Sequence, residues 1–228
     1  MAQMELNLDA FLSTGNQLKT PGFTLPGITT VALLSGVDGF CLSYDGRSAS
    51  FSEKDLELVI AAAMDSRFAL KIAPRAELLQ LALSLPIKQV TFEAENIFDD
   101  YSADLETFIP QLKDAGKLIS FHLDPDLNLL KRAYKLHADL VELNVLDYAF
   151  ASSATGQAEV QEHIALMART AEKNGIGVAV MGGISYQNAP PLVNIESVEN
   201  VVVGRAILGR SVFVGLETAI RDFKATIV

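Results

Sequence analysis

The sequence predicts an α/β fold in which residues 1–228 form a single domain, a closed (β/α)8 TIM barrel. Three observations favour this fold. Short β-rich segments recur about every 20 to 30 residues with helical patterns between them, polar and apolar residues alternate along six of these segments, and glycine-rich turns follow the last two. An open, doubly wound sheet is the alternative, but helices on both of its faces would make its central strands apolar throughout. The alternation favours the barrel, in which every second side chain faces the axis.

Eight strands are expected because β-branched and aromatic residues gather in eight short segments. These are residues 4–9, 39–45, 67–72, 88–95, 117–124, 139–144, 176–182 and 199–204. The segments between them predict helices at 26–35, 52–64, 74–85, 103–115, 126–136, 157–174, 187–194 and 211–226. Start and stop signals support this order: Ser52 opens the second helix, Pro74 lies in the first turn of the third, and Gly116 follows the fourth.

The composition excludes several classes of protein. Half of the residues are hydrophobic and 20% are charged, which is typical of a globular protein and not of a disordered one. No apolar run is long enough to span a membrane, and the first residues lack a secretory signal, so we expect a cytoplasmic protein. The net charge of −10 disfavours nucleic acids and anionic membranes as partners. The single Cys41 excludes a disulfide framework within the chain and a zinc site of several thiolates.

Polar side chains alternate with apolar ones along six of the predicted strands. The apolar set is expected to pack against the helices, while the polar set points inward and gathers near the carboxyl ends of the strands, where barrel enzymes place their sites. The polar set is Asn7, Asp9, Ser43, Asp45, Lys71, Thr91, Glu93, Glu95, Ser120, His122, Asp124, Glu142 and Asn144. Any one of these residues could instead cap a strand end. Cys41 also points inward in this pattern and is interpreted as a small core residue.

Glycine-rich turns follow the seventh and eighth predicted strands. The first contains Gly182 and Gly183, and the second begins with Gly204 and Arg205. In barrels these two loops commonly bind phosphate, because glycine lets backbone N–H groups approach the oxygens and a helix N-terminus adds positive potential. Arg205 would supply the counter-charge. The alternative is that the glycines only allow tight turns.

Lys71 is the only cationic residue of the inward set, and two roles are open for it. It could form a Schiff base with a carbonyl substrate, but the acidic residues around it would keep it protonated. An ion pair or a contact with a substrate anion is favoured. The carboxylates and His122 could also hold a hard divalent cation, although their spacing matches no metal motif and no metal is expected.

Several segments of the chain resemble one known family. They include LNLDAF, MDSRFALKIA, SFHLDPD, VELNVLDYA and MGGISYQN, and the clearest is GRAILGRSVFVGLETAIRDFK near the end. In this order and spacing they are similar to the pyridoxine 5'-phosphate synthases, barrel enzymes of vitamin B6 biosynthesis. The resemblance implies a condensation of 1-deoxyxylulose 5-phosphate with 3-amino-2-oxopropyl phosphate that uses acid–base residues and no metal or organic cofactor.

The chain departs from this family where the resemblance places catalytic residues. Ser43 and Gly182 stand where the family has histidines, and Lys71 stands where it has a glutamate. Two basic positions of the family match Asp45 and Ser50. Other residues agree with the family pattern, and these are Asn7, Asp9, Glu95, Asp124, Glu142, Gly183 and Gly204. The resemblance implies that scaffold and phosphate recognition are kept while the condensation is altered or lost.

Three functions follow as hypotheses. The first is a divergent barrel that binds a small phosphorylated metabolite, with acid–base work passed to Lys71, Glu95, His122 or Glu142 and substrate contacts from residues such as Asn144. The second is a noncatalytic ligand-binding or assembly protein. The third is retained pyridoxine 5'-phosphate synthesis with relocated acid–base groups. A homo-oligomer is possible through Val212, Phe213, Val214 and Leu216, although packing of these residues on the barrel is the favoured interpretation.

Overall fold

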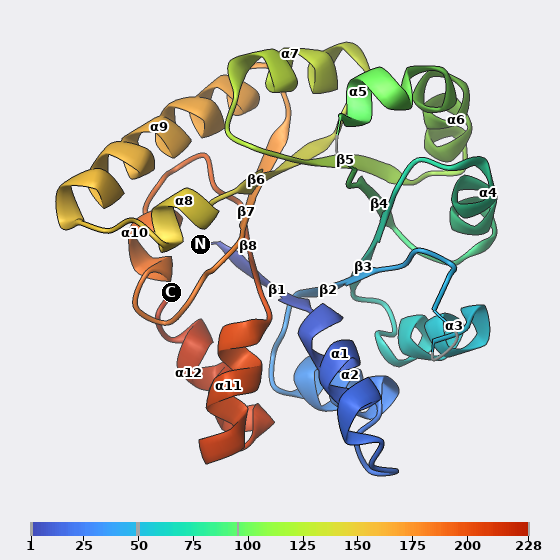
Figure 1. Ribbon diagram of the computed structural model, residues 1–228, viewed down its shortest axis with the longest axis vertical. Helices are drawn as coiled ribbons and strands as arrows, with labels where there is room; N and C mark the ends of the chain where they lie inside the picture. Colours follow the sequence, from blue (N-terminus) through green and yellow to red (C-terminus); the bar gives the residue numbers. More distant parts are fainter. Residues whose placement is uncertain (1, 49–50, 95, 228) are drawn as a thin grey trace.

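The computed structural model describes residues 2–48, 51–94 and 96–227, and its strands form a closed parallel barrel in sequence order (Figure 1). The strands are β1 (Gln3–Asn7), β2 (Gly39–Ser43), β3 (Arg67–Ile72), β4 (Gln89–Phe92), β5 (Leu118–Leu123), β6 (Leu140–Asn144), β7 (Gly177–Met181) and β8 (Asn200–Val203). Each strand pairs with the next, and β1 pairs with β8 to close the ring. The predicted (β/α)8 barrel is confirmed, and so is the place of each strand.

Helices surround the ring of strands (Figure 1). They are α1 (Asp9–Leu18), α2 (Leu25–Leu34), α3 (Glu53–Ala62), α4 (Ala76–Ser84), α5 (Ile97–Asp100), α6 (Ser102–Asp114), α7 (Leu127–Lys135), α8 (Leu146–Ala149), α9 (Ala154–Lys173), α10 (Ala189–Val193), α11 (Arg205–Val214) and α12 (Leu216–Lys224). Local signals fix several ends. At the start of α3, the Ser52 hydroxyl accepts from the Asp55 N–H at 3.3 Å and the Asp55 carboxylate accepts from the Ser52 N–H at 2.8 Å.

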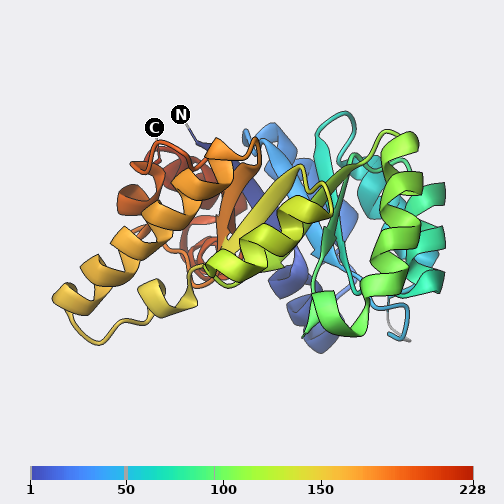
Figure 2. The same cartoon turned by 90° about the horizontal axis from the view of Figure 1, so that it is seen from above.

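Two expectations about the helices are wrong. The predicted helix 211–226 is two helices, because Gly215 takes a φ of +83°, which interrupts the helical path between α11 and α12. Three helices were not predicted, namely α1, α5 and α8, which directly follow β1, β4 and β6. Figure 2 shows them at one end of the barrel and both chain termini at the other. These additional helices surround the end at which the strands finish.

The core has the two layers that the alternation predicts. The large apolar side chains of the strands, such as Leu6, Phe40 and Phe121, belong to the main cluster that includes the helices. Inside the barrel lies a second, smaller cluster of Cys41, Ala69, Ala179 and Val202 with Met181 against it. Cys41 is confirmed as a buried core residue. The narrow interior accepts small side chains near its middle, which leaves the longer polar ones for the two ends.

The amino-terminal end of the barrel is filled by an ion pair. A guanidinium nitrogen of Arg67 lies 3.1 Å from a carboxylate oxygen of Glu5 and donates to Asn200 Oδ1 at 2.7 Å. Glu5 and Asn200 are buried. A cavity of about 330 Å³ beside Arg67 and Asn200 opens at this end, and it is smaller than the two cavities at the opposite end.

Val212 and Phe213 on α11 do not pack on the barrel. Their exposed fractions are 75% and 86%, so the favoured interpretation is wrong for these two residues, whereas Val214 and Leu216 do pack against the core. Val212 and Phe213 lie on the outer side of α11, while Ile207 of the same helix is buried. Among the helices in the described ranges, none is both long enough and apolar enough to span a membrane.

Candidate functional site

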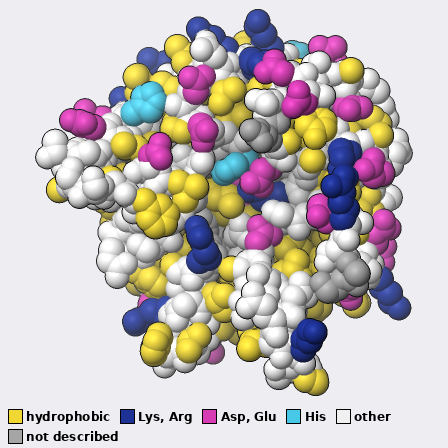
Figure 3. All heavy atoms as spheres, viewed as in Figure 1, with side chains coloured by type: hydrophobic (Ala, Val, Ile, Leu, Met, Phe, Trp, Pro, Cys, Tyr) yellow, Lys and Arg dark blue, Asp and Glu magenta, His cyan; other side chains and the backbone are white. Residues whose placement is uncertain are grey.

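Two adjoining cavities open at the carboxyl ends of the strands. The first, which we call the glycine lobe, has a volume of about 760 Å³ and is lined by Asn7, Asp9, Ser13, Phe150, Met181, Gly182, Gly183, Ile184, Val202, Gly204 and Arg205, among others. The second, the acidic lobe, has a volume of about 670 Å³ and is lined by Asp9, Ser13, Ser43, Asp45, Lys71 and Glu93, among others. The lobes share Asp9 and Ser13. Figure 3 shows acidic, basic and histidine side chains near the middle of this face.

The glycines of the glycine lobe are required by close packing. A Cβ on Gly183 would lie 2.5 Å from Ala149 Cβ, and one on Gly204 would lie 2.6 Å from the Asn7 carbonyl oxygen. Gly182 and Gly183 also have φ values of +114° and +64°, which side chains disfavour. The alternative interpretation of these turns therefore has structural support, and the glycines alone do not indicate phosphate.

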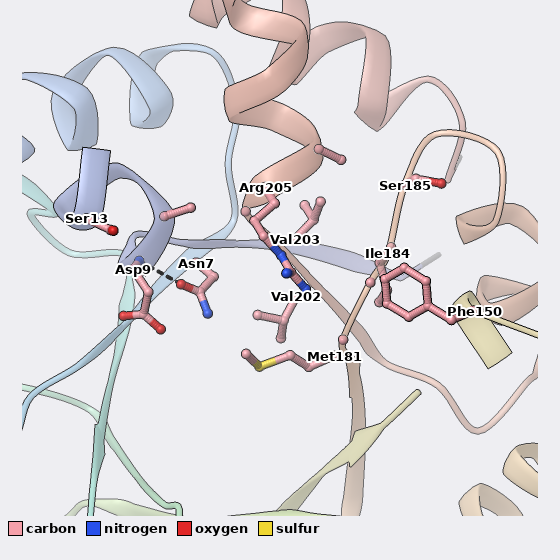
Figure 4. Close-up of a pocket in the computed structure, with 15 residues that line it drawn as sticks. Asn7, Asp9, Ser13, Phe150, Met181, Ile184, Ser185, Val202, Val203 and Arg205 are labelled. Carbon is pink, nitrogen blue, oxygen red and sulfur yellow. Dashed lines mark hydrogen bonds between the residues drawn. The ribbon is translucent and has the colours of Figure 1, made fainter. Parts of the chain in front are cut away.

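Arg205 is the residue of the glycine lobe that most favours the binding of an anion. Its guanidinium points into the pocket (Figure 4), and within the described residues its side chain makes no ion pair or hydrogen bond. Arg205 is also the first residue of α11, whose N-terminus has no side-chain cap at Gly204. Unpaired first-turn N–H groups and an unpaired arginine together attract an anion.

Hydrogen bonds organise the side of the acidic lobe near β1 and β2. The carboxylate of Asp9 accepts from the Ser43 N–H at 2.7 Å and from the Ser43 hydroxyl at 2.9 Å. Asn7 Oδ1 accepts from the Asp9 N–H at 2.7 Å, which holds the first turn of α1. Asp45 is exposed and accepts from the Arg47 N–H at 2.8 Å. Of these residues, Asn7, Asp9 and Ser43 form one connected group at the mouth.

Lys71 lines the acidic lobe and forms a buried ion pair. Its Nζ is 3.1 Å from Glu142 Oε2 and 3.3 Å from Glu93 Oε2, and its side chain is fully buried. The second oxygen of Glu142 accepts from the Thr91 hydroxyl at 3.1 Å. His122 Nδ1 is 3.6 Å from Glu142. The inward alternation therefore brings residues of three strands, β3, β4 and β5, to the buried Glu142 carboxylate on β6.

Charge and burial shift the pKa values of this interior group. Burial opposes the charged form of Glu142, but the Lys71 ammonium and the nearby His122 lower its pKa to about 2. Burial also disfavours the charged form of Lys71, yet Glu142 and its other neighbours raise the pKa of the ammonium above its ordinary value. Burial and the charge of Glu142 raise the pKa of Glu5 to about 7. A protonated Lys71 does not act as a Schiff-base nucleophile in this state, which favours the ion-pair role.

The raised pKa of Glu5 predicts a pH-dependent stability. Between pH 4.5 and about 7 the folded protein holds a proton on Glu5 that the unfolded chain has released, and above this range Glu5 is ionised beside Arg67. The free energy of unfolding should therefore fall as pH rises from 4.5 to about 7. In Glu5→Gln the decrease in the free energy of unfolding over this pH range should be smaller by about 1–3 kcal/mol. Urea unfolding at a series of pH values measures it, with Glu106→Gln on the exposed face of α6 as the control. Equal pH profiles for all three proteins would contradict the assignment.

The structure does not bring every predicted site residue to the two lobes. Asp124 and Asn144 are joined by a hydrogen bond of 2.9 Å and line a separate cavity with Asp147 and His163. A Cβ on Gly182 would lie 2.8 Å from Asn144 Oδ1, so the Asn144 side chain packs closely against the glycine turn. Glu95 lies outside the described residues, as does Ser50.

Sequence reasoning missed several residues of the site. Ser13 lines the glycine lobe from α1, and Phe150 lines it from the position directly after α8; neither helix was predicted. Asn188 holds the first glycine turn, since its side chain accepts from the Ser185 N–H at 2.7 Å and donates to the Gly183 carbonyl at 3.0 Å. Thr91 was in the inward set without a role. Only Thr91 had a signal in the sequence, namely its place in the alternation.

A metal is not favoured by the geometry of the described side chains. Within residues 2–48, 51–94 and 96–227, no group of three or more histidine, cysteine, aspartate and glutamate side chains is arranged to hold an ion. Lys71 occupies the position between Glu93 and Glu142 where a cation would have to sit. The ammonium thus supplies the positive charge that these two carboxylates need.

Solved structures with the same architecture cover the whole chain. A thiamine phosphate pyrophosphorylase from Pyrococcus furiosus matches with a TM-score of 0.67 at 14% identity, covering 99% of this chain and 95% of the other. KGPDC from Streptococcus mutans matches with a TM-score of 0.66 at 14% identity, covering 100% and 97%. At this level of identity the likeness supports the barrel fold alone.

Sequence relatives are more specific. The pyridoxine 5'-phosphate synthase of Syntrophobacter fumaroxidans is 28% identical over 100% of this chain and 99% of its own length. The enzyme of the same name from Prochlorococcus marinus (strain MIT 9313) is 30% identical over 98% of this chain and 95% of its own length. The profile of the family described as "Pyridoxal phosphate biosynthesis protein PdxJ" matches residues 24–228. The resemblance seen in the motifs is confirmed, and the chain belongs to the PdxJ family of vitamin B6 biosynthesis.

Proposed function

We propose that this PdxJ-family barrel binds a small phosphorylated metabolite in the glycine lobe and that its condensation chemistry is altered or lost. The observation that carries the proposal is the guanidinium of Arg205, which points into the lobe beside the uncapped N-terminus of α11. The lobe's volume of about 760 Å³ is in the range of small-molecule sites. An anion there would gain a charge-assisted contact and backbone N–H donors at once.

Three positions support the change in chemistry. The resemblance places a histidine at Ser43, a glutamate at Lys71 and a histidine at Gly182. A serine does not titrate near neutral pH, and the Ser43 hydroxyl is bonded to Asp9. Lys71 is held by carboxylates, and Gly182 has no side chain to move a proton. The family reaction would need other acid–base groups here.

Any remaining acid–base chemistry would fall to Glu142 and His122 in this proposal, with Glu95 as a further candidate. Glu142 is buried and held by Lys71 and Thr91, so it serves better to position its neighbours than to exchange protons. His122 is partly exposed and lies near it. Of these two residues His122 is the more exposed, but neither of them lines the two lobes.

Phosphate binding gives the first test. Inorganic phosphate and phosphorylated sugars should raise the melting temperature, because they bind the folded state. Arg205→Ala should weaken phosphate binding about tenfold or more, since a hydrogen bond to a charged group is lost. Titration calorimetry measures the change. Arg169→Ala on α9 is the control, because Arg169 is exposed and does not line the lobe.

Two outcomes would refute the proposal. If no phosphorylated compound raises the melting temperature, or if Arg205→Ala binds phosphate as the unaltered protein does, the glycine lobe is not a phosphate site. The second part is tested by an assay with 1-deoxyxylulose 5-phosphate and 3-amino-2-oxopropyl phosphate. Formation of pyridoxine 5'-phosphate at a rate typical of the family would show that the reaction is retained.

A further inference from the structure

The glycine turn after β7, residues 182–185, presents unpaired backbone donors to the glycine lobe. Gly183 and Ile184 both line the lobe, and within the described part of the chain neither of their N–H groups makes a hydrogen bond. Gly182 and Gly183 have no side chain to limit their backbone, which leaves the turn many conformations. Free N–H groups bind an anion best when they are already in place. The strength of an anion site here therefore depends on what holds the turn.

Asn188 holds the turn at two points. Its side-chain oxygen accepts from the Ser185 N–H at 2.7 Å, and its side-chain nitrogen donates to the Gly183 carbonyl at 3.0 Å. The Ser185 carbonyl accepts from the Ala189 N–H at 3.0 Å, at the start of α10. The described lining of the lobe includes Gly183 and Ser185 but not Asn188. A ligand would thus contact the turn and not the residue that shapes it.

Tyr148 on α8 holds Asn188 in turn. The Tyr148 side chain is buried, and its hydroxyl donates to the Asn188 carbonyl at 3.0 Å. Gln157 on α9 donates to the Tyr148 carbonyl at 3.2 Å, which fixes the backbone of α8. Neither Tyr148 nor Asn188 is among the described residues that line the two lobes. A series of hydrogen bonds therefore runs from α9 and α8 through Asn188 to the glycine turn.

We propose that Tyr148 and Asn188 are positioning residues that set the affinity of the glycine lobe for phosphate, which rests on the phosphate site proposed above. They order the glycine turn before the ligand arrives, so that phosphate does not have to order it on binding. Arg205 faces the same pocket from a different element, α11 (Figure 4). The pair thus controls the part of the affinity that comes from the turn, while Arg205 supplies the charge.

Tyr148→Phe tests the pair with the least disturbance, because it removes one hydroxyl and keeps the packed ring. It should weaken the binding of inorganic phosphate about two- to tenfold, since one hydrogen bond is lost from the anchor of the turn. Asn188→Ala removes both side-chain bonds to the turn and should weaken binding further. Gln161→Ala is the matched control, because Gln161 on α9 donates to the Pro191 carbonyl of α10 at 3.0 Å and not to the turn. Its phosphate affinity, measured by calorimetry, should be unchanged.

Hydrogen exchange of the Ser185 amide distinguishes positioning from a general loss of stability. Measured by NMR without phosphate, this exchange should be faster in Tyr148→Phe and Asn188→Ala than in Gln161→Ala, because only the first two loosen the turn. Saturating phosphate should slow it again in Tyr148→Phe, since the ligand then orders the turn.

The outcomes separate this proposal from the one on which it rests. If the unaltered protein does not bind inorganic phosphate, the phosphate site is refuted and the role of the pair falls with it. If phosphate binds and Tyr148→Phe keeps the full affinity, only the role of the pair is refuted. The same conclusion follows if Gln161→Ala loses as much affinity as Tyr148→Phe, because the loss then reflects stability. Should Asn188→Ala fail to fold, the comparison of Tyr148→Phe with Gln161→Ala decides.

Discussion

Lys71→Met is expected to lower the free energy of unfolding by about 3–5 kcal/mol, because removal of one partner leaves a buried charge uncompensated. The charge is that of Glu142, which is 1% exposed and lies 3.1 Å from Lys71 Nζ. The raised pKa of Lys71 and the lowered pKa of Glu142 show that each charge depends on the other. Urea unfolding at neutral pH measures the loss.

An exposed ion pair provides the matched control. Arg132 and Asp99 lie 2.6 Å apart with side chains that are 39% and 66% exposed, so Arg132→Met should cost about 1 kcal/mol or less. The double variant Lys71→Met with Glu142→Gln should regain part of the loss, because the uncompensated charge is gone. If Lys71→Met costs no more than Arg132→Met, the pair does not stabilise the barrel. Because such variants are expected to be less stable, the folded fraction of each Lys71 or Glu142 variant has to be measured before its turnover is compared with that of the unaltered protein.

Gly204→Ala is expected to destabilise the protein by about 1–3 kcal/mol and to weaken phosphate binding. The new Cβ would lie 2.6 Å from the carbonyl oxygen of Asn7 and 3.2 Å from its Cβ. The first of these is a backbone atom of the last residue of β1, so β1 and the start of α11 would have to move apart. Such a movement would displace Arg205 and the first-turn N–H groups of α11 together.

The control for this substitution lies in the same helix. A Cβ on Gly209 would meet no atom within 4 Å, and alanine is the better helix former. Gly209→Ala should therefore stabilise the protein by about 0.5–1 kcal/mol and leave phosphate binding unchanged. Thermal unfolding and calorimetry of both variants measure the contrast. Equal stability of Gly204→Ala and the unaltered protein would mean that the close approach of β1 and α11 is not rigid.

The strand pattern was predictable because its period is two. Residues such as Cys41 and Ala69 face the axis, and Phe40 and Phe68 face the helices, as alternation requires. The end of β1 was not predictable in the same way. The alternation continues through Asp9, but Asp9 begins α1, where an acidic residue is favoured in the first turn.

The break between α11 and α12 could not be read from the residues alone. Gly209 and Gly215 lie in one apolar segment, and only Gly215 interrupts the helix. A glycine in a helix is tolerated at modest cost, so the packing of α12 against its neighbours decides which one bends the chain.

The sequence predicted which side chains of the site face inward, but not which of them contact one another. Strand register places Ser43 level with Lys71 and Lys71 level with Thr91, and it places His122 level with Glu142. Alternation gives the face of a side chain and not the register between strands. For this reason the pairing of Lys71 with Glu142, and the separation of Asp124 from the two lobes, required the structure.

The pairing of β1 with β8 has a consequence for the synthesis of the protein on the ribosome. β1 is synthesised first, but one of its edges has no hydrogen-bonding partner until β8, the last strand, has been synthesised. Until then the growing sheet keeps two open edges, β1 on one side and the newest strand on the other, and such edges recruit other chains. The sheet has no open edge only once β8 has paired with β1, so this exposure lasts until nearly the whole chain has been made.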